Sequence, residues 1–169
     1  MGDGIGSASG LRRVDGPAGP VRAVCHLVVG VDRHPSGHAV LAHAIDLADR
    51  LHAYLHVVHV IDLEDAPIDP DDHDWDRRLA DAADSRRESA CAALADSPGN
   101  WTYYSGPGDP VRVLKDLAHA NDALMIVIGA SRGGASALMR RLVGESVSTT
   151  LTHHPDRPVL LVPVTGRDS

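Results

Sequence analysis

Residues 24–62 read VCHLVVGVDRHPSGHAVLAHAIDLADRLHAYLHVVHVID, and this stretch decides the fold. Its first apolar run, 24–31, is short and rich in β-branched residues, as is typical of a strand covered on both faces. Residues 40–51 place apolar side chains at three- and four-residue steps, which predicts a helix with one apolar face. A second β-rich run spans 54–61. Strand, helix and strand in this order predict a right-handed parallel crossover.

The rest of the chain continues the alternation of strands and helices. We expect a flexible Gly- and Pro-rich tail over residues 1–20 and a single domain over 21–169. Further strands are predicted at 101–105, 123–130 and from Val159 to Val164, with one helix before the first of them and one in each interval between them. The helix that follows Asp109 has the clearest start, with a capping Asp and Pro110 in the first turn. Five strands and four helices predict an open, mostly parallel α/β sheet with helices on both faces.

Composition excludes several classes of function. The chain has 16 Lys and Arg against 23 Asp and Glu, a net charge of −7, which disfavours binding to nucleic acid because such binding relies on clustered positive charge. No apolar run approaches the ~20 residues of a membrane span, and no secretory signal is expected. Cys25 and Cys91 form no paired motif, which favours core thiols in a reducing compartment. We therefore expect a cytoplasmic protein without nucleic-acid or membrane partners.

A candidate ligand site lies where the predicted strands end. In open α/β sheets, ligands bind outside the carboxyl ends of the strands, where Asp32, Val60 and Gly129 fall. Residues 129–148, GASRGGASALMRRLVGESVS, follow a strand and open a helix, and backbone N–H groups there attract anions. The segment lacks the Lys of a Walker P-loop and is not G-x-G-x-x-G. From these residues alone, a plain strand-to-helix turn remains an alternative.

The stretches HLVVGVDRHPSG, GDPVRVLKDLAHANDALMIVIGAS and PDRPVLLVP together resemble the universal stress protein family over residues 24–164. The resemblance implies a Rossmann-like domain with a binding or signalling role in stress responses, ATP with Mg²⁺ as a ligand, and a homodimer formed through the last strand. It implies that Asp32 meets the adenosine, that the Val60 backbone binds adenine, and that a G-x2-G-x9-G-[ST] segment wraps the phosphates. The residues so assigned are Val31, Asp32, Val60, Ile128, Gly129, Ser131, Arg132, Gly133, Gly134, Gly144, Glu145, Ser146 and Val147.

The glycine segment departs from the family motif in two ways. Arg132 stands where the second motif glycine belongs, and the segment from Gly129 to Gly144 is two residues longer than the motif. Glu145 occupies the Ser or Thr position, where a carboxylate repels phosphate unless Mg²⁺ or an arginine intervenes. One alternative is therefore a dimeric interaction module of the same fold that binds no nucleotide. Another is a metal-assisted hydrolase that uses Glu145 and Asp32 as ligands.

Other chemistry finds little support in the sequence. The acidic stretch 69–76 lacks the Gly and Glu of an EF-hand loop, so it reads as a solvated loop. The 11 His residues lack zinc spacing, and His56 and His59 should point to opposite faces of their strand. We expect surface or partly buried imidazoles. No G-x-S-x-G elbow is present, so catalysis beyond slow nucleotide hydrolysis is not predicted.

Overall fold

The computed structural model describes residues 10–19, 22–32, 36–61, 74–97, 99–130 and 157–163. The predicted crossover is present as strand β2 (Cys25–Gly30), helix α1 (Ser36–Leu51) and strand β3 (Ala53–Ile61). The two strands are parallel and pair from Cys25↔Ala53 to Gly30↔Val58. The chain turns between α1 and β3 at His52, whose φ of 49° is the left-handed conformation. The alternating pattern of residues 24–62 was therefore sufficient to predict this unit.

The remaining elements follow in the predicted order. They are helix α2 (Trp75–Ala95), strand β4 (Trp101–Pro107), helix α3 (Pro110–Ala120), strand β5 (Met125–Ala130) and strand β6 (Val159–Pro163). Helix α3 starts as expected, because the Asp109 side chain accepts hydrogen bonds from the backbone N–H groups of Val111 and Arg112. The fourth predicted helix would fall within 131–156, outside the described residues.

The sheet differs from the prediction at the N-terminal side of the chain. Residues Arg12–Asp15, expected to belong to a flexible tail, form strand β1 and pair antiparallel with β4. The strand order is β1-β4-β3-β2-β5-β6, so the sheet has six strands where the sequence predicted five. The half-buried Val14 packs against the core, and the Gly16 N–H donates to the Trp101 carbonyl at 2.9 Å. Pairing with β4 thus orders a segment with little apolar surface.

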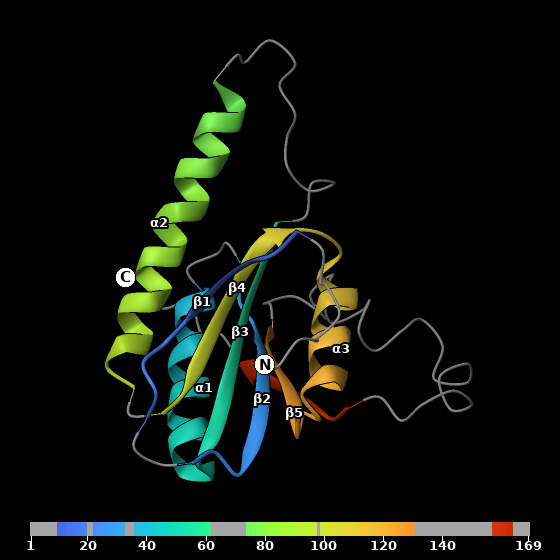
Figure 1. Ribbon diagram of the computed structural model, residues 1–169. Coiled ribbons are helices and arrows are strands. Elements are labelled where there is room, and N and C mark those ends of the chain that lie inside the picture. The colour runs from blue at the N-terminus through green and yellow to red at the C-terminus, as the bar shows by residue number, and fades with distance from the viewer. Residues whose placement is uncertain are drawn as a thin grey trace, which may run out of the picture.

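Helices cover both faces of the sheet, as predicted. Figure 1 shows α2 and α3 on opposite sides of it. On the α1 and α2 side, Leu27, Val29 and Val57 pack against helical residues such as Leu41 and Leu94. On the other side, Val28, Val58 and Ile128 pack against Leu114 and Ala118 of α3. Successive residues of a strand point to opposite faces, so β2 contributes to both cores.

Two further findings concern the described helices and the two cysteines. None of the described helices is long and apolar enough to cross a membrane. Cys25 and Cys91 are both free and half-buried. Burial raises the pKa of the Cys91 thiol, which keeps it protonated and poorly reactive.

Candidate functional site

The carboxyl ends of β2, β3 and β5 meet at one edge of the sheet, as the sequence predicted. Val29 pairs with Val127, so Val31 and Gly129, each two residues further on, lie at the same level of neighbouring strands. The Val31 N–H donates to the Val58 carbonyl at 2.9 Å, and Val60 follows two residues later. Parallel register thus brings Asp32, Val60 and Gly129 to the same edge.

The backbone of Val60 is directed past the end of β2. Backbone groups of alternate residues in a strand point to the same side. The Val58 carbonyl accepts from β2, whereas the Ile61 carbonyl accepts from Gly108 on the β4 side at 3.4 Å. Val60 therefore directs its amide and carbonyl toward the β2 side, beyond Gly30, the last residue of β2 that pairs with β3. A ligand at this edge can be reached by that backbone.

The Ile128 and Gly129 side of the edge is more closed. Ile128 is fully buried and belongs to the core under α3, where its Cγ2 atom would lie 3.1 Å from a Cβ built on Gly30. Gly129 is half-buried and pairs with Val162 of β6. The predicted residues Ser131, Arg132, Gly133, Gly134, Gly144, Glu145, Ser146 and Val147 lie outside the described residues, as do residues 69–73 of the acidic stretch.

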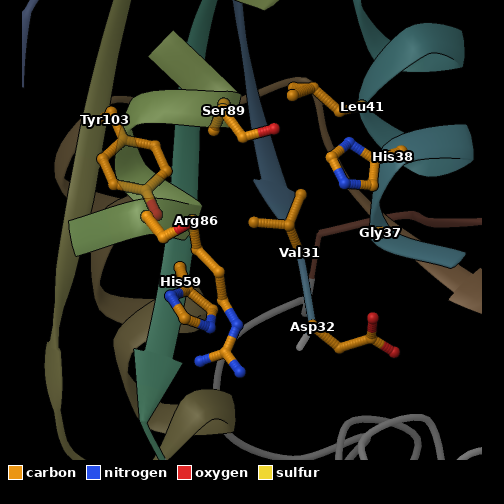
Figure 2. Close-up of a pocket in the computed structure, with 11 residues that line it drawn as sticks. Val31, Asp32, Gly37, His38, Leu41, His59, Arg86, Ser89 and Tyr103 are labelled. Carbon is orange, nitrogen blue, oxygen red and sulfur yellow. The ribbon is translucent and has the colours of Figure 1, made fainter. Parts of the chain in front are cut away.

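A pocket of about 200 Å³ lies beside this edge, on the face covered by α1 and α2. Figure 2 shows it opening between the start of α1 and the middle of α2. Its lining residues are Val31, Asp32, Gly37, His38, Leu41, His59, Ser85, Arg86, Ser89, Ala90 and Tyr103. Of the sequence-predicted residues, Val31 and Asp32 line the pocket, and Val60, Ile128 and Gly129 do not.

Asp32 is exposed and lies against the first turn of α1. A Cβ built on Gly37 would lie 2.8 Å from the Asp32 carbonyl oxygen and 3.4 Å from its Oδ1 atom. Only glycine allows this approach, because contacts below 3.0 Å to backbone force a shift. The site thus depends on a residue that sequence reasoning did not select.

His59 is a buried residue of the pocket, with 3% exposure, whereas the sequence led us to expect a surface or partly buried imidazole. Its Nδ1 atom is buried without a hydrogen-bond partner. Burial first, and then the charge of Arg86, lower the pKa of His59, so the ring is neutral near pH 7. The prediction was wrong because β3 is covered on both faces, and a residue on either face of such a strand is buried.

Arg86 projects from α2 into the pocket, and Figure 2 shows its guanidinium beside His59. Other arginines of this helix form ion pairs within it, Arg77 with Asp74 at 3.6 Å and Arg87 with Asp84 at 3.4 Å. No such pair is found for Arg86 in the part of the chain that the structure describes. The sequence offered no local signal for this residue, because α2 reaches the pocket only through tertiary packing.

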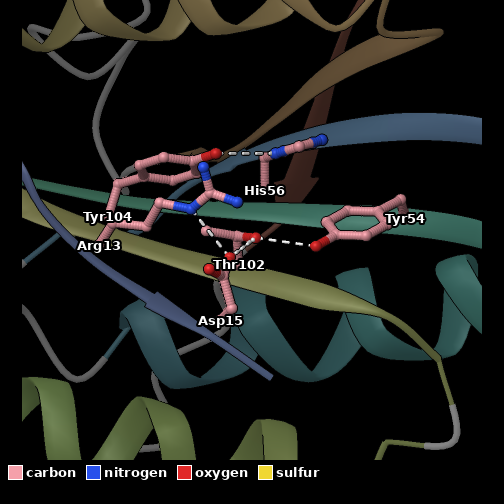
Figure 3. A network of polar contacts seen from close by, with 6 residues as sticks. All are labelled: Arg13, Asp15, Tyr54, His56, Thr102 and Tyr104. Atoms are coloured by element: carbon pink, nitrogen blue, oxygen red, sulfur yellow. Dashed lines mark hydrogen bonds and ion pairs between the residues drawn. The ribbon is translucent and has the colours of Figure 1, made fainter. Parts of the chain in front are cut away.

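A polar network occupies the opposite face of the sheet, near the amino ends of the strands (Figure 3). His26 Nδ1 lies 3.0 Å from His56 Nε2, and His56 Nδ1 lies 3.3 Å from the Tyr104 hydroxyl. The Thr102 hydroxyl donates to Asp15 Oδ1 at 2.7 Å. Both nitrogens of His56 are therefore engaged by protein groups. We interpret this network as structural, since it joins β1 to the sheet.

His56 also contradicts the expectation of surface or partly buried imidazoles, because it is only 4% exposed. Burial first, and then the neighbouring His26, lower its pKa from 6.5 to about 4. The predicted placement of His56 and His59 on opposite faces of β3 is confirmed, since one joins this network and the other lines the pocket. Across the described residues, no group of three or more His, Cys, Asp and Glu side chains could hold a metal ion.

Comparison with known proteins gives one family and several similar structures. The model of the universal stress protein family matches residues 25–163. A universal stress protein from Burkholderia pseudomallei is 24% identical, with a TM-score of 0.57 over 85% of this chain and 99% of that one. A universal stress protein from Archaeoglobus fulgidus in complex with dAMP is 20% identical, with a TM-score of 0.55 over 83% and 98% of the two chains.

A universal stress protein in complex with cAMP is 22% identical, with a TM-score of 0.53 over 85% of this chain and 100% of that chain. At these identities the structures establish a shared fold. No match to a curated protein was found.

Proposed function

This chain belongs to the universal stress protein family, and on that premise we propose that it binds an adenine nucleotide, ATP with Mg²⁺, at the carboxyl edge of β2, β3 and β5. Its role would be binding or signalling in a cytoplasmic stress response, with at most slow hydrolysis of the nucleotide. Family members of the same fold in complex with cAMP and with dAMP support an adenine ligand.

The backbone of Val60 is the observation that carries the proposal. Its amide and carbonyl point past the last paired residue of β2, toward the space above Val31 and Asp32. A donor and an acceptor presented side by side suit the edge of a nucleobase. Asp32, one step along the same edge, offers its carboxylate to a ribose hydroxyl.

The size of the neighbouring pocket limits where the nucleotide can lie. At about 200 Å³ the pocket is smaller than the roughly 300–1,000 Å³ of most small-molecule sites. We therefore place the nucleotide over the sheet edge, with its phosphates toward residues 129–147. Mg²⁺ would accompany the phosphates of the bound ATP, because it is commonly held by substrate phosphates together with waters.

The test is calorimetric titration with Mg-ATP, preceded by mass spectrometry of nucleotides released from freshly purified, denatured protein. Asp32→Ala should weaken binding by about tenfold or more, since a hydrogen bond to a charged group contributes about 1.5–3 kcal/mol. Asp46→Ala is the matched control, because Asp46 is an exposed residue of α1 that pairs only with Arg50 in the described structure. Glu145→Ser should tighten binding. Absence of released nucleotide together with no heat at millimolar Mg-ATP would refute the proposal.

A second proposal, a homodimer formed through β6, rests on the edge of the sheet. Within the described residues β6 pairs only with β5 and ends the strand order. Its Leu160 is 41% exposed, and an uncovered apolar edge strand is a surface for pairing with another copy. Light scattering should give the mass of a dimer, and Leu160→Glu should shift it toward monomer. A monomeric mass for the unmodified protein at all concentrations would exclude this interface.

A further inference from the structure

The pocket between α1 and α2 adjoins the proposed nucleotide edge and shares Val31 and Asp32 with it, but most of its lining lies elsewhere. Its walls come from α1, α2, β3, β4 and the residues that follow β2, and β5 contributes none of them. His59 lines the pocket, whereas Val60, the next residue, packs its side chain on the opposite face of the sheet. We therefore consider the pocket as a site for a separate ligand, or for a distinct part of a larger ligand.

The residues of α2 at ion-pairing distance from Arg86 cannot pair with its guanidinium. On a helix, ion pairs form three or four residues apart. The residues at those distances from Arg86 are small and uncharged, namely Ala82, Ala83, Ser89 and Ala90. These side chains cannot form an ion pair, and Ser89 and Ala90 also line the cavity into which the arginine extends.

The groups around the guanidinium favour an acceptor ligand. The His59 ring is neutral, so it carries no charge that competes with a ligand, and its Nδ1 atom has no hydrogen-bond partner. A buried polar atom without a partner is unfavourable, and a bound group or an ordered water that reaches it would relieve this. The Ser89 hydroxyl supplies a further donor.

Among the residues that the structure describes, Asp32 is the carboxylate that lines the pocket. Figure 2 shows its carboxylate turned away from Arg86, and Oδ1 lies over Gly37 at the start of α1. Asp32 therefore leaves the guanidinium open to another negatively charged group. A guanidinium with its donors unpaired binds carboxylate and phosphate groups with paired hydrogen bonds.

We propose that this pocket is a binding site for a small anion, a phosphate or carboxylate group held by Arg86 with hydrogen bonds from His59 and Ser89. The volume of about 200 Å³ suits such a group better than a whole nucleotide. The anion is either a free molecule or a phosphate of a nucleotide that directs this group into the pocket instead of toward residues 129–147. The site does not depend on nucleotide binding, so either proposal can fail alone.

The experiment follows backbone amide shifts by NMR while inorganic phosphate is added at constant ionic strength. Saturable shifts are expected at Gly37 and Ser89. Arg86→Gln should weaken phosphate binding by about tenfold or more, and Arg86→Lys, which keeps the charge but loses the planar fork, should weaken it less. Arg77→Gln is the matched control on the same helix, since Arg77 is exposed and pairs with Asp74. It should bind as the unmodified protein does.

Two results would overturn the proposal. One is the absence of saturable shifts at millimolar phosphate in the unmodified protein. The other is equal phosphate affinity in the unmodified protein and in folded Arg86→Gln. A parallel titration in the presence of AMP identifies the source of the anion. Loss of phosphate binding under AMP, together with AMP-induced shifts at Ser89, supports a nucleotide phosphate in the pocket, and unchanged phosphate binding supports a free anion.

Discussion

Acidification from pH 7 to pH 4 should destabilise the protein through His56. Its ring is buried and both ring nitrogens face protein groups, His26 Nδ1 at 3.0 Å and the Tyr104 hydroxyl at 3.3 Å. Burial and the proximity of His26 lower the pKa of His56 to about 4 in the folded protein. The other charged or titratable groups facing it are Tyr54, Arg13 and Asp15.

The magnitude follows from the difference between the folded and unfolded pKa values. A free histidine titrates near 6.5, which is about 2.5 above the folded value. Each unit of pKa corresponds to 1.36 kcal/mol, so the free energy of unfolding should be about 3 kcal/mol lower at pH 4 than above pH 6.5, where His56 is neutral in both states. Between pH 6.5 and pH 4 the unfolded chain binds the proton first, and stability falls by up to about 1.4 kcal/mol per pH unit. Below pH 4 both states are protonated and no further loss occurs.

The assay is urea unfolding at pH 7, 6, 5 and 4 for the unmodified protein, for His56→Gln and for His43→Gln. His43 is an exposed histidine of α1 and serves as the control. The free energy of unfolding of the unmodified protein should fall by about 3 kcal/mol more than that of His56→Gln over this range, and His43→Gln should follow the unmodified protein. Equal pH dependence of the unmodified protein and His56→Gln would refute the argument.

Three further changes test the structure elsewhere. Asp109→Ala removes the side-chain cap of α3 and should lower the free energy of unfolding by about 0.5–2 kcal/mol in urea titrations; an unchanged midpoint would contradict the cap. Thr102→Val removes the hydroxyl that joins β4 to β1, and should increase hydrogen exchange in residues 12–15 while leaving α3 protected. Gly37→Ala places a Cβ 2.8 Å from the Asp32 carbonyl oxygen and should destabilise the protein by about 1–3 kcal/mol. Gly99→Ala, with its nearest neighbour at 3.7 Å, is the control, and equal melting temperatures of the two variants would contradict the contact at Gly37.

Local patterns predicted most of the secondary structure and the class of fold. The run 24–31, the helical spacing over 40–51 and the Asp109–Pro110 start each act within a few residues, so no distant contact is needed to interpret them. The meeting of Asp32, Val60 and Gly129 at one edge also followed from sequence, because parallel strands place their carboxyl ends together.

Contacts between residues far apart in the sequence determined the features that local patterns could not predict. Residues 12–15 became a strand only because β4, about 90 residues further along the chain, offers them an edge. His56 and His59 became buried because helices and neighbouring strands cover both faces of β3, and strand alternation alone does not say what lies on each face. Arg86 reached the pocket because α2 packs beside the start of α1. Local sequence patterns were enough to predict β2 to β6, α1 to α3 and the edge at which the parallel strands end. Only the tertiary structure showed strand β1 and the side chains from distant elements that share one cavity, because burial and charge pairing depend on neighbours in space.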